Sequence, residues 1–254
     1  MYYSVCTDIL YPGLPAQEAL RRAAKAGYGA YEFWSWEDRD IDAIHRAQDE
    51  TGMRLTAMCT SCASPVDPAQ HDAFADGLIR SIETARKLGC LRLITQPGSD
   101  RPGVSREAQF GAMFRLFERC APILEDAGVT LLLEPLNALV DHKGCFLSRS
   151  DEAFRVIRTV GSPRIRLLFD IYHQQITEGN LIRNLTENVE LIGHIHAAGN
   201  PGRHELTGEN EIDYRSVFGA LKRAGYDGAV GLEYAPLTDA DESLRILRER
   251  IPLD

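Results

Sequence analysis

The chain has 254 residues, 44% hydrophobic and 26% charged, which is the composition of an ordinary globular protein and excludes a disordered or fibrous one. Its 28 Lys and Arg against 37 Asp and Glu give a net charge of −9 without any basic cluster, so nucleic acid is not expected as a partner. No apolar run approaches the roughly 18 residues of a membrane span, and the first residues lack a signal-peptide pattern, so we expect no membrane association and a cytoplasmic location.

A repeated pattern of helix-like segments, glycines and apolar runs predicts the strands. An apolar run at Tyr2–Thr7 opens it, and six times a helix-like segment then ends in Gly and is followed at once by another apolar run, at Gly27, Gly52, Gly89, Gly128, Gly161 and Gly225. Gly is favoured there because it adopts the left-handed conformation that follows a last helical turn. The interval from Gly161 to Gly225 is nearly twice the others, and the apolar run Val189–His196 in its middle supplies one more strand. The sequence therefore predicts eight strands.

Helices are predicted between these strands, where apolar residues recur at spacings of three and four. The expected helices are Ala16–Ala26, Ile41–Thr51, Pro68–Leu88, Arg106–Ala127, Ser150–Val160, Leu181–Asn188, Tyr214–Ala224 and Ala240–Arg250. The strands are short and almost continuously apolar, as parallel strands covered on both faces are. Eight such units in about 250 residues predict an α/β fold, a single (β/α)8 TIM barrel that forms one domain over residues 1–254. A doubly wound open sheet is the alternative, but its Gly-rich phosphate turn is missing after the first strand.

Ionisable residues end five of the predicted strands. They are Glu32, Glu134, Asp170, His196 and Glu233. In a TIM barrel the chemistry takes place at these strand ends, and an ionisable residue beside an apolar run is costly unless it is paired or bound to a cation. Three carboxylates and one imidazole suit a divalent metal such as Mn²⁺, Mg²⁺ or Co²⁺. The prediction is a metal centre of Glu134, Asp170, His196 and Glu233; the alternative is that each carboxylate only caps a helix or forms an ion pair.

Four further residues are candidates for substrate binding. They are His173, Arg203, Glu32 and Asn137. Arg203 is a permanent cation that could clamp a carboxylate or another oxyanion. His194 faces the same side of its strand as His196, and its deeper position favours an interior histidine over a ligand.

Two tryptophans, Trp34 and Trp36, follow the second predicted strand. They could stack on a sugar at the mouth of the barrel, or they could pack against neighbouring loops and close the barrel. The sequence leaves both possibilities open.

Several segments resemble the hydroxypyruvate isomerase family of the xylose-isomerase-like TIM-barrel superfamily, and the resemblance covers essentially the whole chain. The segments are Leu133–Asn137, Phe169–Gln175, His194–Glu205, Gly208–Tyr214 and Gly225–Tyr234. The resemblance implies that Glu134 and Glu233 are an acid/base pair that also reaches the metal, with Asp170 and His196 completing the metal site. It also implies that His173 and Arg203 match positions that contact substrate oxygens in related ketose 3-epimerases. One departure is His196, where Gln often stands in hydroxypyruvate isomerases and His is typical of the epimerases.

The function expected from these residues is that of a metal-dependent isomerase. It would act on a small hydroxy-keto acid or short keto sugar by proton transfer through an enediolate, with two Glu as acid and base. The alternatives are a ketose 3-epimerase or a keto-sugar lyase that uses the same site. A DNA-repair nuclease of the same superfamily and a non-catalytic sugar-binding barrel are less consistent with the charge and with the retained Glu pair. Barrels of this kind often form homo-oligomers, although the sequence identifies no interface.

Overall fold

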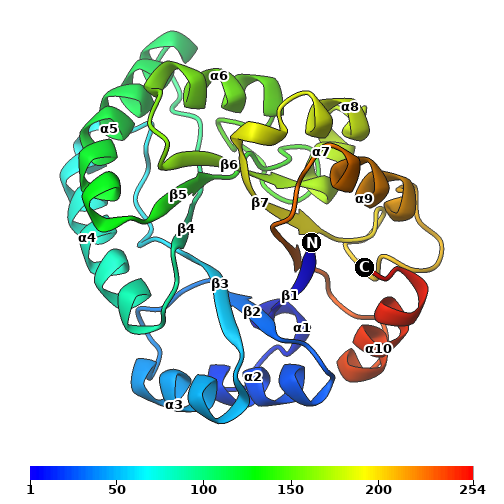
Figure 1. The fold of residues 1–254 in the computed structure, drawn as a ribbon. Helices are drawn as coiled ribbons and strands as arrows, with labels where there is room; N and C mark the ends of the chain where they lie inside the picture. The colour runs from blue at the N-terminus through cyan, green and yellow to red at the C-terminus, as the bar shows by residue number, and fades with distance from the viewer. Residues whose placement is uncertain (254) are drawn as a thin grey trace.

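Eight parallel strands close into one barrel in chain order (Figure 1). The computed structural model describes residues 1–253. The strands are β1 (Tyr2–Cys6), β2 (Ala30–Phe33), β3 (Arg54–Cys59), β4 (Arg92–Thr95), β5 (Thr130–Leu133), β6 (Ile165–Asp170), β7 (Ile192–Ala197) and β8 (Ala229–Leu232). β1 pairs in parallel with β8, so the sheet has no free edge. The predicted TIM-barrel fold is confirmed.

The helices form the outer layer around this barrel (Figure 1). The helices that correspond to predicted ones are α2 (Ala16–Lys25), α3 (Ile41–Thr51), α4 (His71–Lys87), α5 (Arg106–Ala127), α6 (Ser150–Val160), α8 (Leu181–Thr186), α9 (Tyr214–Arg223) and α10 (Ala240–Arg250). Two short helices that the sequence analysis did not predict, α1 (Thr7–Leu10) and α7 (Ile171–Thr177), begin directly after β1 and β6. Among the described residues, no helix combines the length and the apolar character that crossing a membrane requires.

The six predicted glycines all have positive φ, from 65° at Gly89 to 91° at Gly225. Because a side chain is strained in this conformation, Gly at these positions fixes where each helix ends and the chain turns back to the next strand. The strand predicted over Val189–His196 begins later than expected. Val189–Leu191 forms a 3-10 turn, η2, and β7 starts at Ile192; a second such turn, η1 (Pro68–Gln70), precedes α4.

The interior of the barrel is apolar on one side and polar on the other. A fully enclosed apolar cluster is formed by Ala57, Ile94, Leu132 and Leu168. Elsewhere inside the barrel a chain of hydrogen-bonded side chains links Ser4, Thr56, Glu32 and His194. A buried carboxylate and imidazole inside a barrel are unusual, since buried ionisable groups are costly unless they are bonded.

Candidate active site and metal centre

The predicted strand-end residues meet at one mouth of the barrel. Glu134 and Glu233 directly follow β5 and β8, Asp170 is the last residue of β6, and His196 is the last but one of β7. The strands are parallel and adjacent in chain order from β5 to β8, so their carboxyl ends lie side by side. All four side chains are buried, with relative exposures between 1% and 5%.

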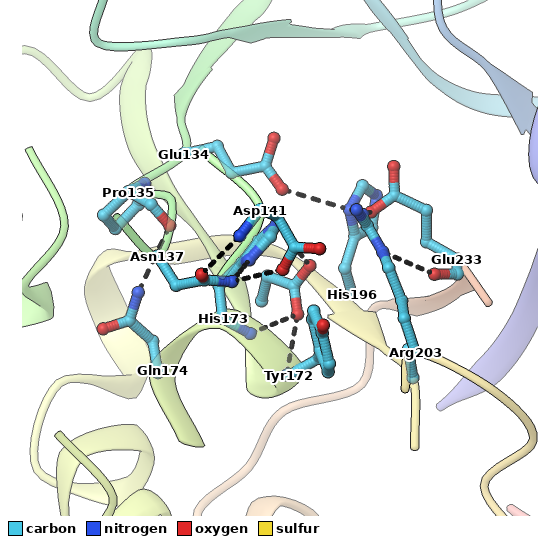
Figure 2. A network of polar contacts seen from close by, with 12 residues as sticks. Glu134, Pro135, Asn137, Asp141, Tyr172, His173, Gln174, His196, Arg203 and Glu233 are labelled. Carbon is cyan, nitrogen blue, oxygen red and sulfur yellow. Dashed lines mark hydrogen bonds and ion pairs between the residues drawn. The ribbon is translucent and has the colours of Figure 1, made fainter. Parts of the chain in front are cut away.

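These four side chains can hold one cation between them. Each offers a ligand atom, and the four atoms lie within 4.8 Å of one another. His196 Nδ1 lies 3.3 Å from Glu134 Oε1 and 3.2 Å from Glu233 Oε2, with the two carboxylates on either side of the imidazole (Figure 2). Glu134 Oε1 and His196 Nδ1 are buried, yet neither has a hydrogen-bond partner among the described residues. A divalent cation fits this arrangement, because it would bind the Glu134 oxygen and the His196 nitrogen, which are costly to bury without a partner.

The pKa shifts at the site follow from burial and from the close charges of opposite sign. Burial raises the pKa of Asp170, and the nearby Glu233 raises it further. Burial also acts to raise the pKa of Glu233, but His196 and Arg203 outweigh it and hold that pKa well below its usual range. For His196, burial acts to lower the pKa, while Glu32 and Glu233 raise it well above its usual value. The nearby carboxylates thus favour the protonated, positively charged form of His196.

Asp170 has two roles, one for each oxygen. Its Oδ1 accepts hydrogen bonds from the backbone N–H groups of Tyr172, at 2.7 Å, and His173, at 3.2 Å, and so caps α7. Its Oδ2 lies 3.6 Å from His173 Nε2 on the side of the metal centre. Asp170 therefore caps a helix while its second oxygen lies beside the other predicted site residues, and the unexpected helix α7 is what places His173 at the mouth.

His173 presents an N–H group to the site because of Asn137. The amide oxygen of Asn137 accepts from the backbone N–H groups of Val140 and Asp141, which leaves its NH₂ group facing His173 Nδ1 at 2.6 Å (Figure 2). An amide NH₂ only donates, so Nδ1 is the acceptor and Nε2 carries the proton. Burial lowers the pKa of His173 to about 4, which keeps the ring neutral near pH 7.

Arg203 and Trp34 hold the carboxylate of Glu233. Arg203 Nη2 donates to Glu233 Oε2 at 2.5 Å, and Trp34 Nε1 donates to Glu233 Oε1 at 2.7 Å. The Arg203 guanidinium also lies over the Tyr172 ring, 5.5 Å from its centroid. The two acid/base candidates therefore differ, because both oxygens of Glu233 have donors whereas Glu134 Oε1 has none.

A cavity of about 530 Å³ opens over these residues. Five of the predicted site residues line it, namely Glu134, His173, His196, Arg203 and Glu233. Residues of the segments that follow β3 and β4 also line it, with Ser61, Ser64, Gln70, Gln96 and Ser99 among them. The cavity thus combines the buried charged residues with side chains that bear hydroxyl and amide groups.

Asp170, Asn137 and Glu32 are the predicted residues that do not line the cavity, and the last two lie behind its wall. Asn137 is fully buried and reaches the cavity only through His173. Glu32 is 1% exposed and faces His194 and His196 inside the barrel. Direct substrate contact was expected of both residues; the structure instead puts one side chain between each of them and the cavity, because Glu32 lies within β2 and the Asn137 loop folds its amide inwards.

The two tryptophans have separate roles. Trp34 lines the cavity and is 40% exposed, whereas Trp36 donates to Ser81 Oγ and packs against the apolar core outside the barrel. Packing outside the cavity therefore describes Trp36, whereas stacking of Trp34 on a sugar stays a prediction. The bond from Trp34 to Glu233 is a site contact that the sequence does not predict, since it joins the residues that directly follow β2 and β8, which are far apart in the chain.

Comparison with known proteins places the chain in a family. Residues 20–250 match the family model described as Xylose isomerase-like TIM barrel. The hydroxypyruvate isomerase of Escherichia coli (strain K12) is 29% identical over 234 residues, which are 89% of this chain and 90% of that protein. The 2-oxo-tetronate isomerase of Cupriavidus necator is 32% identical over 181 residues, 71% of this chain and 69% of that protein.

A solved structure agrees over the full length. The crystal structure described as AP endonuclease, family 2, from Brucella melitensis superposes with a TM-score of 0.92 at 27% identity, covering 99% of this chain and 100% of that one. The length of these matches, the closed barrel and the carboxylates at its mouth all agree with one family assignment. The chain belongs to the xylose isomerase-like TIM barrel family and, within it, to the hydroxypyruvate isomerase family.

Proposed function

We propose that this protein is a metal-dependent isomerase of a small hydroxy-keto acid or short keto sugar, with Glu134 and Glu233 as its acid/base pair. One observation carries the proposal. The two carboxylates come from different strands, are both buried, approach His196 Nδ1 to within 3.3 Å and line the same cavity. Carboxylates held this close repel each other, and a reaction that removes and returns a proton makes use of both.

Glu134, Asp170, His196 and Glu233 would hold the cation, and their oxygen-rich donor set favours Mn²⁺, Mg²⁺ or Co²⁺. When bound there, a divalent cation stabilises the negative charge that develops on the substrate's carbonyl and hydroxyl oxygens as a C–H proton leaves. The isomerases found among the relatives of this chain support the reaction class.

The chain's own residues divide the proton transfer between them. Glu134, whose Oε1 has no hydrogen-bond donor among the described residues, is the better placed to take the proton from the carbon that bears the hydroxyl group. The Nε2–H group of neutral His173 donates to a substrate oxygen on which charge develops. Arg203 and Trp34 hold the Glu233 carboxylate in place. Return of the proton to the neighbouring carbon, with a proton shift between the two oxygens, completes an isomerisation.

Ketose 3-epimerisation is the second candidate, and the cavity favours considering it. About 530 Å³ is far more than a three-carbon acid fills, and the lining offers hydroxyl and amide groups that suit a hydroxyl-bearing carbon chain. Glu134 and Glu233 stand on either side of His196 (Figure 2), so return of the proton to the opposite face of the same carbon is open to this site as well.

Proton exchange with solvent tests the proposal. The protein, loaded with Mg²⁺, is incubated in D₂O with hydroxypyruvate, 2-oxo-tetronate and a panel of free ketoses, and deuterium incorporation is followed by NMR. Isomerisation places deuterium on the neighbouring carbon, whereas epimerisation places it on the same carbon with inverted configuration. Absence of exchange in every substrate, from protein shown to contain metal, would remove the proton-transfer proposal.

A further inference from the structure

A buried carboxylate that the proposed reaction does not use lies directly beneath His196. Glu32 Oε2 accepts from His194 Nε2 at 2.7 Å and from Thr56 Oγ1 at 3.3 Å, and Glu32 Oε1 lies 3.1 Å from His196 Nε2. The side chains of Glu32, His194 and His196 are at most 2% exposed.

The neighbouring strand leaves room for this contact. Gly231 of β8 pairs with His196 of β7, and a Cβ at position 231 would collide with Glu32 Oε1 and lie 2.6 Å from His196 Cδ2. The backbone of Gly231 has no positive φ that would itself call for glycine. Glycine is therefore required at this position by the space that the Glu32 carboxylate and the His196 ring occupy.

The imidazole of His196 is thus held between two sets of carboxylates. Its Nδ1 faces Glu134 and Glu233, and its Nε2 faces Glu32 alone. A neutral imidazole carries one proton, and a carboxylate beside Nε2 favours the form in which that nitrogen is protonated and the Nδ1 lone pair is free. Ring orientation and ligand basicity are commonly set in this way by a carboxylate behind a metal-binding histidine.

We propose that Glu32 is a positioning residue that fixes the orientation and tautomer of His196, so that Nδ1 is available to a cation, and that Gly231 makes this contact possible. The inference rests on the proposed metal centre. Glu32, His194 and His196 also offer ligand atoms within 4.8 Å of one another, so a second cation held by them directly is the competing interpretation. Positioning is favoured because Glu32 and His194 do not line the cavity and already bond to each other.

Two variants test the contact, one with a change at Glu32 and one with a change at Gly231. Glu32→Gln removes the charge but keeps the shape, and Gly231→Ala keeps every charge but displaces the carboxylate from the ring. Both are expected to weaken Mn²⁺ binding about 10- to 100-fold, measured by competition with a chromophoric chelator, and to change the visible spectrum of the Co²⁺-loaded protein. Glu178→Gln is the matched control. Its side chain is 6% exposed and bonds to Ser150 and Asn184, away from the centre, so both readouts should stay as in the wild type.

The outcomes separate this inference from the proposed metal centre. Unchanged affinity and spectrum in both variants would overturn the positioning role while leaving the centre in place. Two cations per wild-type chain and one in Glu32→Gln would show that Glu32 is itself a ligand, which also overturns it. A wild-type chain that binds no cation removes the centre and the inference together. Where a variant does not fold, the ring ¹⁵N spectrum of the Zn²⁺-loaded wild type decides: Nε2 of His196 must carry the proton, and a protonated Nδ1 contradicts the proposal.

Discussion

Replacing Glu134 by Gln should abolish turnover and yet stabilise the metal-free protein. Around the centre, four carboxylates, those of Glu32, Glu134, Asp170 and Glu233, face two positive groups, His196 and Arg203. Glu134 Oε1 has no hydrogen-bond donor within residues 1–253, so in the metal-free protein this residue is a buried charge with incomplete compensation. Gln has almost the same shape and no charge.

The expected gain follows from the cost of burial. An unpaired buried ion costs several kcal/mol, against about 1–3 kcal/mol for a buried amide. Part of the ion's cost is already offset by His196, 3.3 Å away, so we expect Glu134→Gln to raise the free energy of unfolding by about 1–3 kcal/mol. For a chain of this length each kcal/mol corresponds to about 2–4 °C in Tm. The variant should therefore unfold about 2–12 °C above the wild type in a chelator.

Bound metal should make the wild type more stable than Glu134→Gln. Free cation at about 1,000 times its Kd stabilises the wild type by about 4.1 kcal/mol, more than the expected gain of the variant, which has lost a ligand. Differential scanning calorimetry with chelator and with Mn²⁺ measures both differences. The control is again Glu178→Gln, which breaks charge-assisted bonds to Ser150 and Asn184 and should lower Tm under both conditions. A Glu134→Gln protein that is less stable than the wild type in chelator would refute the reasoning.

Three further predictions concern the same mouth of the barrel. Glu233→Gln should lower kcat about 10²- to 10⁴-fold with an unchanged circular dichroism spectrum, and a variant of undiminished activity would contradict its acid/base role. His173→Phe removes the Nε2–H donor and should lower kcat about 10²- to 10³-fold without changing Mn²⁺ affinity, whereas His142→Phe, on the same cavity wall, should leave kcat within a few-fold of the wild type; equal losses in both would argue for a general effect on the wall. The wild type should neither bind nor nick a duplex with an abasic site at low salt, because its net charge of −9 disfavours DNA, and nicking that tracks metal loading would reopen the nuclease alternative.

The barrel itself could be predicted because its signal is local and repeated. Each glycine after a helix reports a left-handed turn, and this depends on only a few neighbouring residues. The 3-10 turn at Val189–Leu191 and the short helix α7 were missed because both lie within or beside an apolar run, where a strand and a single helical turn look alike.

The site could be predicted only as far as the rim of the barrel. Counting strand ends identifies which side chains reach the same mouth, and it brought Glu134, Asp170, His196 and Glu233 together correctly in space. Counting strand ends does not show how deep inside the barrel a side chain lies. Glu32 stands one residue before the end of β2, and its side chain lies one layer below the ligands, whereas Glu134 and Glu233 follow their strands and reach the cavity. The depth of Asn137 is set by backbone bonds within its own loop, which no spacing rule encodes.

The barrel interior directly below the predicted metal ligands has an unusual composition. A TIM-barrel interior is ordinarily filled with branched apolar side chains, as it is here at Ile94, Leu132 and Leu168. Beneath His196, β1, β2, β3 and β7 supply Ser4, Glu32, Thr56 and His194 instead. Packing alone would favour apolar residues at these positions, since a buried ion pair is often no better for stability than a hydrophobic replacement. A polar layer confined to the side of the barrel under the imidazole is therefore better explained by support for the metal centre above it than by stability of the fold.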